Sequence, residues 1–328
     1  MGLLDVRPDD LLPILAIILV VLVIALGDFI NFFLPSRAIP AASEYTYVSA
    51  LNPDEPKPLP SLGDTPSVKL SIVVPAYDET ERLKPMIDST LTHLHSLRPH
   101  RSFEILIVDD GSRDGTADLA LKLSISHAKT DSKDEIRVVR LETNRGKGGA
   151  VKHGFMHARG ERILFVDADD ATRFSDLETL WSKMDEMEGD EGAPAIVIGS
   201  RAHLVNSEAV VKRSKIRNFL MKGFHTILRI LGVGHIGDTQ CGFKLFNRAA
   251  AQQVFPPLHL PTWIFDVEIL LVAQALNIPV LEIPVHWKEI PGSKLNIAGA
   301  SLGMLRDLLL MRANYMLGRW TPYDFRED

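Results

Sequence analysis

The chain of 328 residues has little of several things, and each shortage excludes something. A single cysteine, Cys241, excludes an internal disulfide and is typical of a reducing compartment. No Asn-x-Ser/Thr sequence is present, so no glycosylation signal marks any part of the chain as luminal. There is no excess of basic residues, and the formal net charge of -6 argues against a nucleic-acid-binding protein, because few cations are left to neutralise phosphates. No internal repeat is visible.

One long apolar run lies near the N-terminus. Residues 11–26 read LLPILAIILVVLVIAL without a charge, and the apolar character continues beyond them. About 20 apolar residues are enough to cross a bilayer as a helix, so residues 11–34 are predicted to be a transmembrane anchor after a short tail at residues 1–10. A cleaved signal peptide is the competing interpretation, but the preceding residues are acidic rather than basic. Arg7 and Arg37 flank the run almost evenly and leave its orientation open.

The rest of the chain divides by texture. Residues 35–67 are rich in proline, serine and alanine, which predicts an extended linker. In residues 68–296, short β-rich runs alternate with helix-length segments, which predicts an α/β domain with a mostly parallel sheet flanked by helices. The β-rich runs are residues 70–74, 105–108, 138–141, 163–166 and 195–198.

The C-terminal region has a helical period. Residues 297–320 place apolar side chains on a wide face, with three arginines and one aspartate elsewhere. One interpretation is a helix that covers the sheet, and the other is an interfacial helix that lies on a bilayer. Both remain open, and we assign residues 297–328 to an amphipathic, membrane-associated helix and tail.

Two acidic groups stand directly at predicted strand ends, where ligands bind in parallel α/β sheets. Asp167-Ala168-Asp169 places two carboxylates where Mg²⁺ or Mn²⁺ could be held together with phosphate oxygens, although an aspartate here could instead cap the next helix. Asp109-Asp110 could accept a hydrogen bond from the ring N–H of uracil or guanine, although a simple glycine-containing turn is the alternative.

A glycine-rich segment, NRGKGG at residues 144–149, adds a third candidate. It lacks the spacing of a P-loop, because the first glycine of that motif is missing before Lys147 and no Ser or Thr follows it. A glycine-rich helix entrance around Gly146 can still expose backbone N–H groups to a diphosphate.

In combination these motifs resemble family 2 glycosyltransferases of the GT-A fold, and the resemblance covers residues 69–296. The motifs that carry it are SIVVPAYDE (71–79), IVDDGSRDGT (107–116), NRGKGGAVKHG (144–154), FVDADD (165–170) and IGSR (198–201). A further string, DTQCGFKLFNR at residues 238–248, is similar to the acceptor-side segment of the polyprenyl-phosphate branch. The resemblance implies a Rossmann-like GT-A catalytic domain.

The resemblance also implies a donor site. The candidate contacts to the nucleotide and its diphosphate are Pro75, Ala76, Tyr77, Glu79, Val108, Asp109, Asp110, Gly146, Lys147, Asp167, Ala168, Arg201, Lys288 and Lys294. Asp167 and Asp169 would hold Mg²⁺ or Mn²⁺, with Asp169 as the direct ligand. Lys288 stands where mannosyltransferases of this branch have an arginine, and lysine does not bind a phosphate in the bidentate way that arginine does.

The implied reaction is inverting transfer of glucose from UDP-glucose to dolichyl phosphate. The candidate catalytic residues are Asp169, Asp238, Arg201 and Lys244. Arg201 and Lys244 would hold the lipid phosphate, while Asp238 would orient its segment or act as a weak base. Cys241 has no base paired with it in the sequence and is expected to be a small buried residue. Transfer of mannose from GDP-mannose remains open, because residue spacing does not distinguish the two sugars.

Two other classes fit less well. A processive polysaccharide synthase would need several membrane spans and a Gln-x-x-Arg-Trp string, whereas Met316 occupies the glutamine position here. An inactive nucleotide-binding scaffold would be expected to lack the acidic pair or the basic residues, and both are present. The resemblance implies a single-pass protein of the endoplasmic reticulum membrane, with its catalytic domain facing the cytosol. Self-association remains open.

Overall fold

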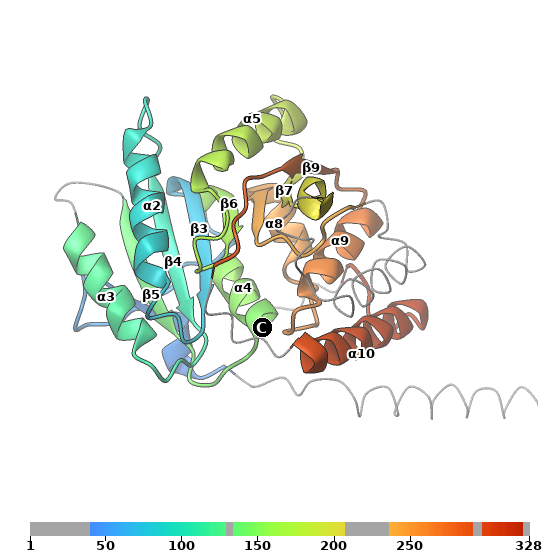
Figure 1. Ribbon diagram of the computed structural model, residues 1–328, viewed down its shortest axis with the longest axis horizontal. Helices are drawn as coiled ribbons and strands as arrows, with labels where there is room; N and C mark the ends of the chain where they lie inside the picture. The colour runs from blue at the N-terminus through green and yellow to red at the C-terminus, as the bar shows by residue number, and fades with distance from the viewer. Residues whose placement is uncertain (1–39, 129–133, 207–235, 291–296, 324–328) are drawn as a thin grey trace, which may run out of the picture.

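The computed structural model describes residues 40–128, 134–206, 236–290 and 297–323 (Figure 1). The anchor predicted at residues 11–34 lies outside these ranges. Within them, no helix combines the length and the apolar character that a membrane span requires.

The described residues form a nine-stranded sheet with the order β2-β1-β5-β4-β3-β6-β8-β7-β9. In chain order the strands are β1 (Thr46–Ser49), β2 (Lys57–Pro58), β3 (Val68–Ala76), β4 (Phe103–Asp109), β5 (Glu135–Arg140), β6 (Gly160–Val166), β7 (Ile196–Ser200), β8 (Phe243–Asn247) and β9 (Val280–Pro284). The five strands that the sequence predicted are all present, as β3 to β7. Strands β8 and β9 were not predicted.

The sheet is mixed rather than mostly parallel, which corrects the expectation from the sequence. Strands β5, β4, β3 and β6 run parallel, as do β7 and β9. Strand β8 runs antiparallel between β6 and β7, and β1 is antiparallel to both of its neighbours. Because two reversals restore the original direction, β6 and β7 still end at the same edge of the sheet.

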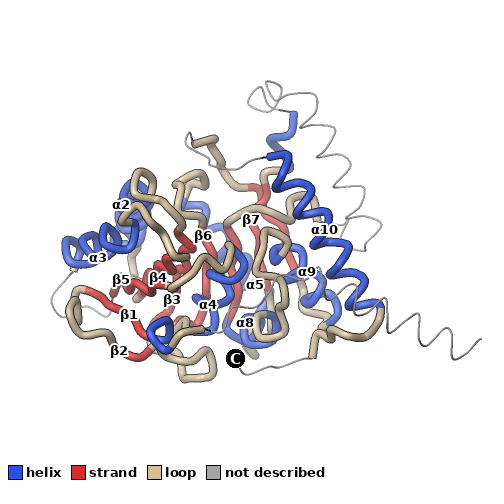
Figure 2. Tube along the Cα trace, turned by 90° about the horizontal axis from the view of Figure 1, so that it is seen from below, coloured by secondary structure: helices blue, strands red, loops and turns tan. Residues whose placement is uncertain are grey.

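Helices cover both faces of the sheet (Figures 1 and 2). They are η1 (Ala42–Tyr45), α2 (Leu83–Ser96), α3 (Thr116–His127), α4 (Lys147–Met156), η2 (Phe174–Asp176), α5 (Leu177–Glu188), η3 (Ala202–Asn206), α8 (Arg248–Val254), α9 (Phe265–Ala275) and α10 (Ile297–Met316). Alternation along β3 divides the core: Ile72 and Val74 pack with α2, α3 and α5, whereas Val73 packs with α4, α8, α9 and α10. The domain is therefore a three-layer α/β fold.

The predicted linker is wrong for its described part. From residue 40 onward this segment forms η1 and two strands, and β1 pairs with β5 through Val48 and Val138. The pairing is supported by polar contacts across the sheet, since Ser49 Oγ donates to a carboxylate oxygen of Glu135 at 2.7 Å. These residues belong to the α/β domain.

Helix α10 covers the domain and also exposes apolar side chains. Leu308 and Met311 are fully buried against the core that lies over α9. Leu302, Leu309 and Met316 are 71%, 55% and 74% exposed, so they point away from it. The helix thus has the packing role that one interpretation predicted, together with a second apolar stripe that this packing leaves uncovered.

Candidate active site

Three strand ends bring the predicted site residues together. Strand β3 lies between β4 and β6 and is parallel to both, so the residues after Ala76, Asp109 and Val166 meet at one edge of the sheet. A backbone hydrogen bond from Asp110 N to Ala76 O, 2.8 Å long, joins two of these ends directly. The sequence prediction of a common site at the carboxyl ends of the strands agrees with this geometry.

The Asp110 carboxylate organises the glycine-rich loop. Its two oxygens accept hydrogen bonds from the backbone N–H groups of Arg145 and Gly146, at 2.7 and 3.0 Å. Asp110 is almost fully buried, and burial raises the pKa of its carboxyl group to about 6. Gly146 has a φ of +83°, and a Cβ there would lie 2.6 Å from Pro261 O, so the turn requires glycine. Asp110 thus fixes the conformation of the glycine-rich loop at this edge of the sheet.

The loop after β3 packs beside the loop after β4, since Asp78 N donates to Ser112 Oγ at 2.9 Å. Tyr77 is 43% exposed, which leaves an aromatic ring available at the site. The Glu79 carboxylate is paired with Arg82, at 2.7 Å from its Nε, and burial raises the pKa of Glu79. Ala76 and Val108 are buried in the core, so their side chains are not available to a ligand.

The acidic pair follows β6 directly. Lys147, the first residue of α4, donates from Nζ to Asp167 Oδ1 at 2.6 Å. Asp169 Oδ1 accepts from Ala171 N at 3.0 Å, so this aspartate also closes the following turn. Burial, and then the charge of Asp167, raise the pKa of Asp169. The positive charge near Asp167 and Asp169 does not fully balance their two carboxylates, so the pair would accept a cation.

Gly242 makes room for Asp167. Asp167 N donates to Gly242 O at 3.1 Å where β6 and β8 pair, and a Cβ on Gly242 would lie only 2.0 Å from Asp167 Oδ2. The segment that carries Gly242 therefore packs directly under the acidic pair, and Ala168, which is buried, lies between the two aspartates.

The acidic pair fits a divalent metal only in part. Among the described residues, no group of three or more His, Cys, Asp and Glu side chains could hold a metal. Mg²⁺ usually takes one or two protein carboxylates together with substrate phosphates and water, and Asp167 and Asp169 match that donor set. The site would thus be completed by a diphosphate.

Arg201 and Asp238 form a clamp beside this pair. Arg201 follows β7, and its guanidinium binds the Asp238 carboxylate through Nε at 2.6 Å and through a second nitrogen at 2.9 Å. Burial raises the pKa of Asp238, but the hydrogen bonds and charge of Arg201 outweigh it and hold that pKa below its usual value. Asp238 is therefore suited to orienting Arg201 rather than to accepting a proton.

Lys244 corrects a prediction. Its side chain lies in β8 and is fully buried, and Nζ donates to Asp266 Oδ1 and to Cys241 O, both at 2.6 Å. The prediction that Lys244 grips the acceptor phosphate is wrong in this structure, because its charge is already neutralised inside the core. Cys241 is also buried, and burial raises the pKa of its thiol to about 12, so it is not a nucleophile.

Lys288 and Lys294 are the two basic residues predicted on the diphosphate side of the site. Lys288 pairs with Asp170, which has a φ of +57°, through a contact of 2.8 Å at the rim of the site. Lys294 lies outside the described residues.

Two side chains near the acidic pair were not predicted. The Trp263 ring centroid is 4.9 Å from Lys147 Nζ, and Asp266 neutralises Lys244 beneath the site. Both lie in an apolar stretch before and within α9 that carries no motif, so the sequence offered no signal for them. Their roles follow only from contacts between residues that are distant in sequence.

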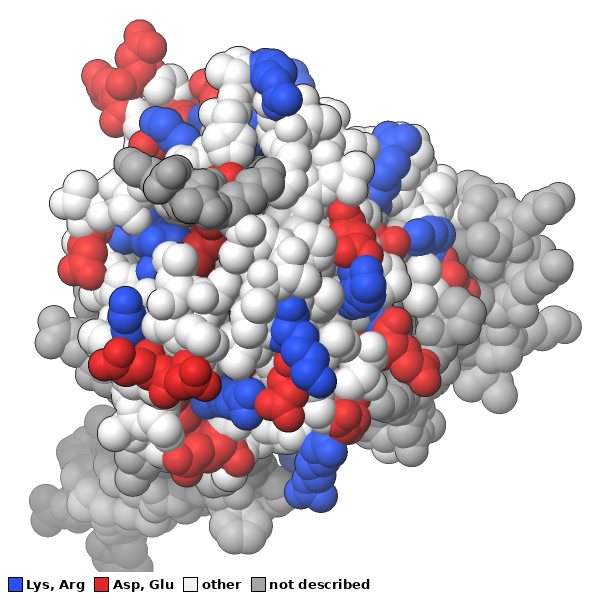
Figure 3. Space-filling view, turned by 90° about the vertical axis from the view of Figure 1, so that its left-hand side faces the viewer, with Lys and Arg blue, Asp and Glu red and all other residues white. Residues whose placement is uncertain are grey.

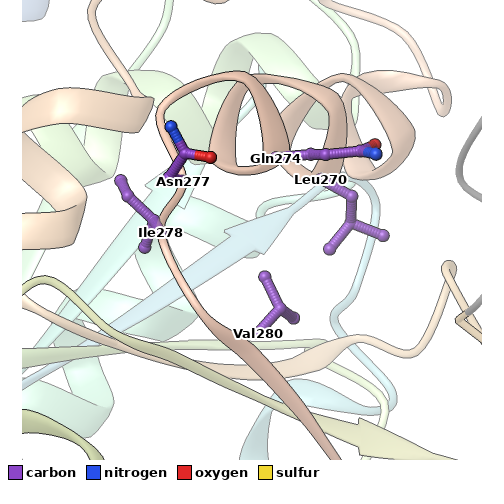
Figure 4. Close-up of a pocket in the computed structure, with 5 residues that line it drawn as sticks. All are labelled: Leu270, Gln274, Asn277, Ile278 and Val280. Carbon is purple, nitrogen blue, oxygen red and sulfur yellow. The ribbon is translucent and has the colours of Figure 1, made fainter.

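A separate pocket of about 270 Å³ lies at the C-terminal end of α9 (Figure 4). Leu270, Gln274, Asn277, Ile278 and Val280 line it, and none of them is a predicted site residue. Across the face shown in Figure 3, Lys and Arg side chains are interspersed with Asp and Glu, as is typical of a solvated surface.

Comparisons with known proteins agree with this arrangement. The model of glycosyl transferase family 2 matches residues 71–255. A crystal structure of glucosyl-3-phosphoglycerate synthase from Mycobacterium tuberculosis, in complex with Mn²⁺ and UDP-glucose, is similar with a TM-score of 0.51 and 18% identity. That similarity covers 76% of this chain and 80% of the other, and it shows a shared GT-A-like fold. The chain belongs to glycosyltransferase family 2.

Within the family, its relatives are more specific. The chain is 43% identical over 311 residues to the dolichyl-phosphate beta-glucosyltransferase of Saccharomyces cerevisiae, covering 92% of each chain. It is 45% identical over 265 residues to the human protein of the same name, covering 80% of each. The family resemblance in the sequence is thus confirmed, and these relatives are dolichyl-phosphate β-glucosyltransferases.

Proposed function

We propose that this protein transfers glucose from UDP-glucose to dolichyl phosphate with inversion at the sugar. The observation that carries the proposal is the identity of 43% over 92% of both chains with a relative of that name. The site supports it, because a nucleotide loop, an acidic pair and an arginine clamp stand at one edge of the sheet. Dolichyl β-D-glucosyl phosphate would be the product, for use in protein N-glycosylation.

On the donor side, Asp110 and the loop that it holds would receive the uridine, and the exposed ring of Tyr77 would be available to contact it. Asp167 and Asp169 would hold Mg²⁺ or Mn²⁺, which when bound would supply positive charge for the departing diphosphate. Lys147, already 2.6 Å from Asp167, lies where it can add positive charge on the same side. Stabilising the leaving group in this way is the main catalytic requirement.

On the acceptor side, a phosphate needs little help from a base. The second pKa of a phosphomonoester is near 6, so the acceptor is largely a dianion at neutral pH. The carboxylates on this side agree with that chemistry, because Asp238 and Asp266 are each engaged with a cation. Arg201, which Asp238 orients, is the residue that would hold the lipid phosphate.

We propose that α10 brings the domain to the membrane surface. Leu302, Leu309 and Met316 are spaced by seven residues, which puts them on one side of the helix, and Arg306 lies beside them with its side chain half exposed. Exposed apolar residues next to basic ones are typical of interfacial helices. Together with the predicted anchor, this is the basis for our proposal that the protein works at the endoplasmic reticulum membrane with its site toward the cytosol.

Vesicle binding tests the role of α10. Leu309→Glu together with Met316→Glu should reduce co-sedimentation with anionic vesicles, whereas Leu51→Glu, which alters an exposed leucine on another part of the domain, should not. Equal binding by all three proteins would contradict a membrane-facing α10.

A transfer assay tests the reaction itself. Full-length protein in detergent is supplied with dolichyl phosphate and radiolabelled UDP-glucose or GDP-mannose, with and without EDTA. Chelator-sensitive label in the lipid fraction from UDP-glucose alone is the expected result. Label from GDP-mannose instead would overturn the sugar assignment. Nucleotide binding without a lipid product from either donor would overturn the acceptor.

A further inference from the structure

Glu44 is a buried acid that is distant in sequence from the strand ends, yet it contacts the glycine-rich loop that Asp110 holds. It lies in η1, in the segment that the sequence predicted to be a linker, and it is 1% exposed. Its Oε1 accepts a hydrogen bond from Glu142 N at 2.8 Å, and its Oε2 accepts one from the Arg145 guanidinium. One carboxylate therefore binds both the start of the loop and the charged side chain within it.

Arg145 connects Glu44 to the site. Asp110 accepts hydrogen bonds from the backbone N–H groups of Arg145 and Gly146, and the next residue, Lys147, pairs with Asp167. Arg145 and Gly146, which contact Asp110, are thus followed directly by Lys147, which contacts Asp167. Any displacement of Arg145 would move both.

Glu44 is itself held from several directions. Its backbone carbonyl accepts from His153 Nε2 at 2.8 Å, and the ring of Tyr45 lies 5.9 Å from His153 and 5.7 Å from His157, centroid to centroid. Tyr45 O also accepts from Leu59 N at 2.8 Å. Because both rings belong to α4 or its end, η1 is fixed on the helix that the loop enters. Glu44 therefore presents a fixed negative charge to Arg145.

We propose that Glu44 is a positioning residue for the donor nucleotide. It fixes Arg145 so that the Arg145 and Gly146 amides stay directed at Asp110, and it keeps the loop in the conformation that receives the nucleoside diphosphate. This inference rests on the proposed use of a nucleotide-sugar donor. It assigns a binding role to the segment between the predicted anchor and the first strand.

The test compares Glu44→Gln with Ser43→Ala in the full-length protein. Ser43 is the matched control, because it is the adjacent residue and its hydroxyl donates to the exposed side chain of Glu142 rather than to the backbone of the loop. UDP affinity is measured by calorimetry, and KM for UDP-glucose, KM for dolichyl phosphate, kcat and the melting temperature are measured alongside. Glu44→Gln should weaken UDP binding and raise the donor KM by about tenfold, the size expected for loss of one charge-assisted hydrogen bond.

The acceptor KM and kcat should change little in Glu44→Gln, and Ser43→Ala should match the unaltered protein throughout. Arg145→Met should weaken UDP binding similarly, and adding Glu44→Gln to it should have little further effect, because the two residues act as one unit. Unchanged UDP affinity in Glu44→Gln, with or without a lower melting temperature, would reduce Glu44 to a structural residue and overturn the proposal. If the unaltered protein binds UDP but makes no glucolipid, the proposed function fails while this binding test still stands.

Discussion

The contact between Gly242 and Asp167 makes a sharp prediction about Gly242→Ala. A Cβ at this position would lie 2.0 Å from Asp167 Oδ2 and 2.3 Å from its Cγ. Carbon and oxygen atoms rarely approach closer than about 3.3 Å, so the carboxylate must retreat by about 1 Å or more. A misplacement of about 1 Å in a catalytic arrangement can cost about 100-fold in rate, which is the loss that we expect in kcat.

The fold should tolerate the same change. The side chain of Asp167 is 33% exposed, so it can rotate toward solvent instead of compressing the core. The melting temperature should therefore fall by only a few degrees. By contrast, a Cβ at Gly154 would lie 2.4 Å from Val73 Cγ1 inside the core, so Gly154→Ala should destabilise the protein strongly.

The assay is glucose transfer to dolichyl phosphate across a Mn²⁺ titration, with Gly63→Ala as the control. A Cβ on Gly63 would meet only Ser61 Oγ, at 3.5 Å, which is an ordinary contact. Gly242→Ala should need more Mn²⁺ and turn over slowly, and Gly63→Ala should be unaffected. Normal turnover with a normal Mn²⁺ requirement in Gly242→Ala would refute the role of Asp167 in the site.

Three further predictions concern buried side chains that can carry a charge. Lys244→Met should lower the free energy of unfolding by about 3–5 kcal/mol, because it leaves the buried Asp266 carboxylate unpaired. Urea titration measures this free energy, and a small loss would contradict a buried ion pair. Burial lowers the pKa of His153 to about 3, so below about pH 6.5 the unfolded chain binds a proton at this residue and the folded chain does not. The free energy of unfolding should therefore fall by about 1.4 kcal/mol per pH unit as the pH drops below about 6.5, and His153→Gln should flatten that dependence. Arg201→Lys should raise the acceptor KM by about tenfold, because lysine cannot make the two parallel hydrogen bonds that the guanidinium makes to Asp238. Asp238→Asn should keep most of the turnover, and abolished turnover in this variant would restore Asp238 as a base.

The sequence predicted the surroundings of Asp109 and Asp167 better than those of Lys244, for a physical reason. Apolar runs that end in Asp109 or Asp167 reveal both the strand and what stands at its end, because both signals are local. Lys244 interrupts β8 with a charge, and its neutralising partner, Asp266, is supplied by a different element. A strand with a buried charge cannot be distinguished locally from a polar loop that binds phosphate.

The same limit explains the segment before β3. Its prolines and charges are typical of a linker, and Glu44 alone gives no sign of burial. It is buried because Arg145, about a hundred residues later, neutralises it. Contacts of this kind depend on the complete fold, so they could not be predicted from local composition.

The antiparallel pairing of β6 with β8 also limits how this chain can vary in length. Val166 is in register with Phe243, so the next residue on β6 meets the preceding residue on β8, which is how Asp167 reaches Gly242. Inserting or deleting one residue at the start of β8 would bring a side chain under the acidic pair and turn the strand's other side chains to the wrong face. Gly189 and Gly192, where an added Cβ would meet nothing within 4 Å, mark a turn that should accept extra residues freely. Length changes during divergence are therefore expected to collect in that turn, while the segment entering β8 keeps its length.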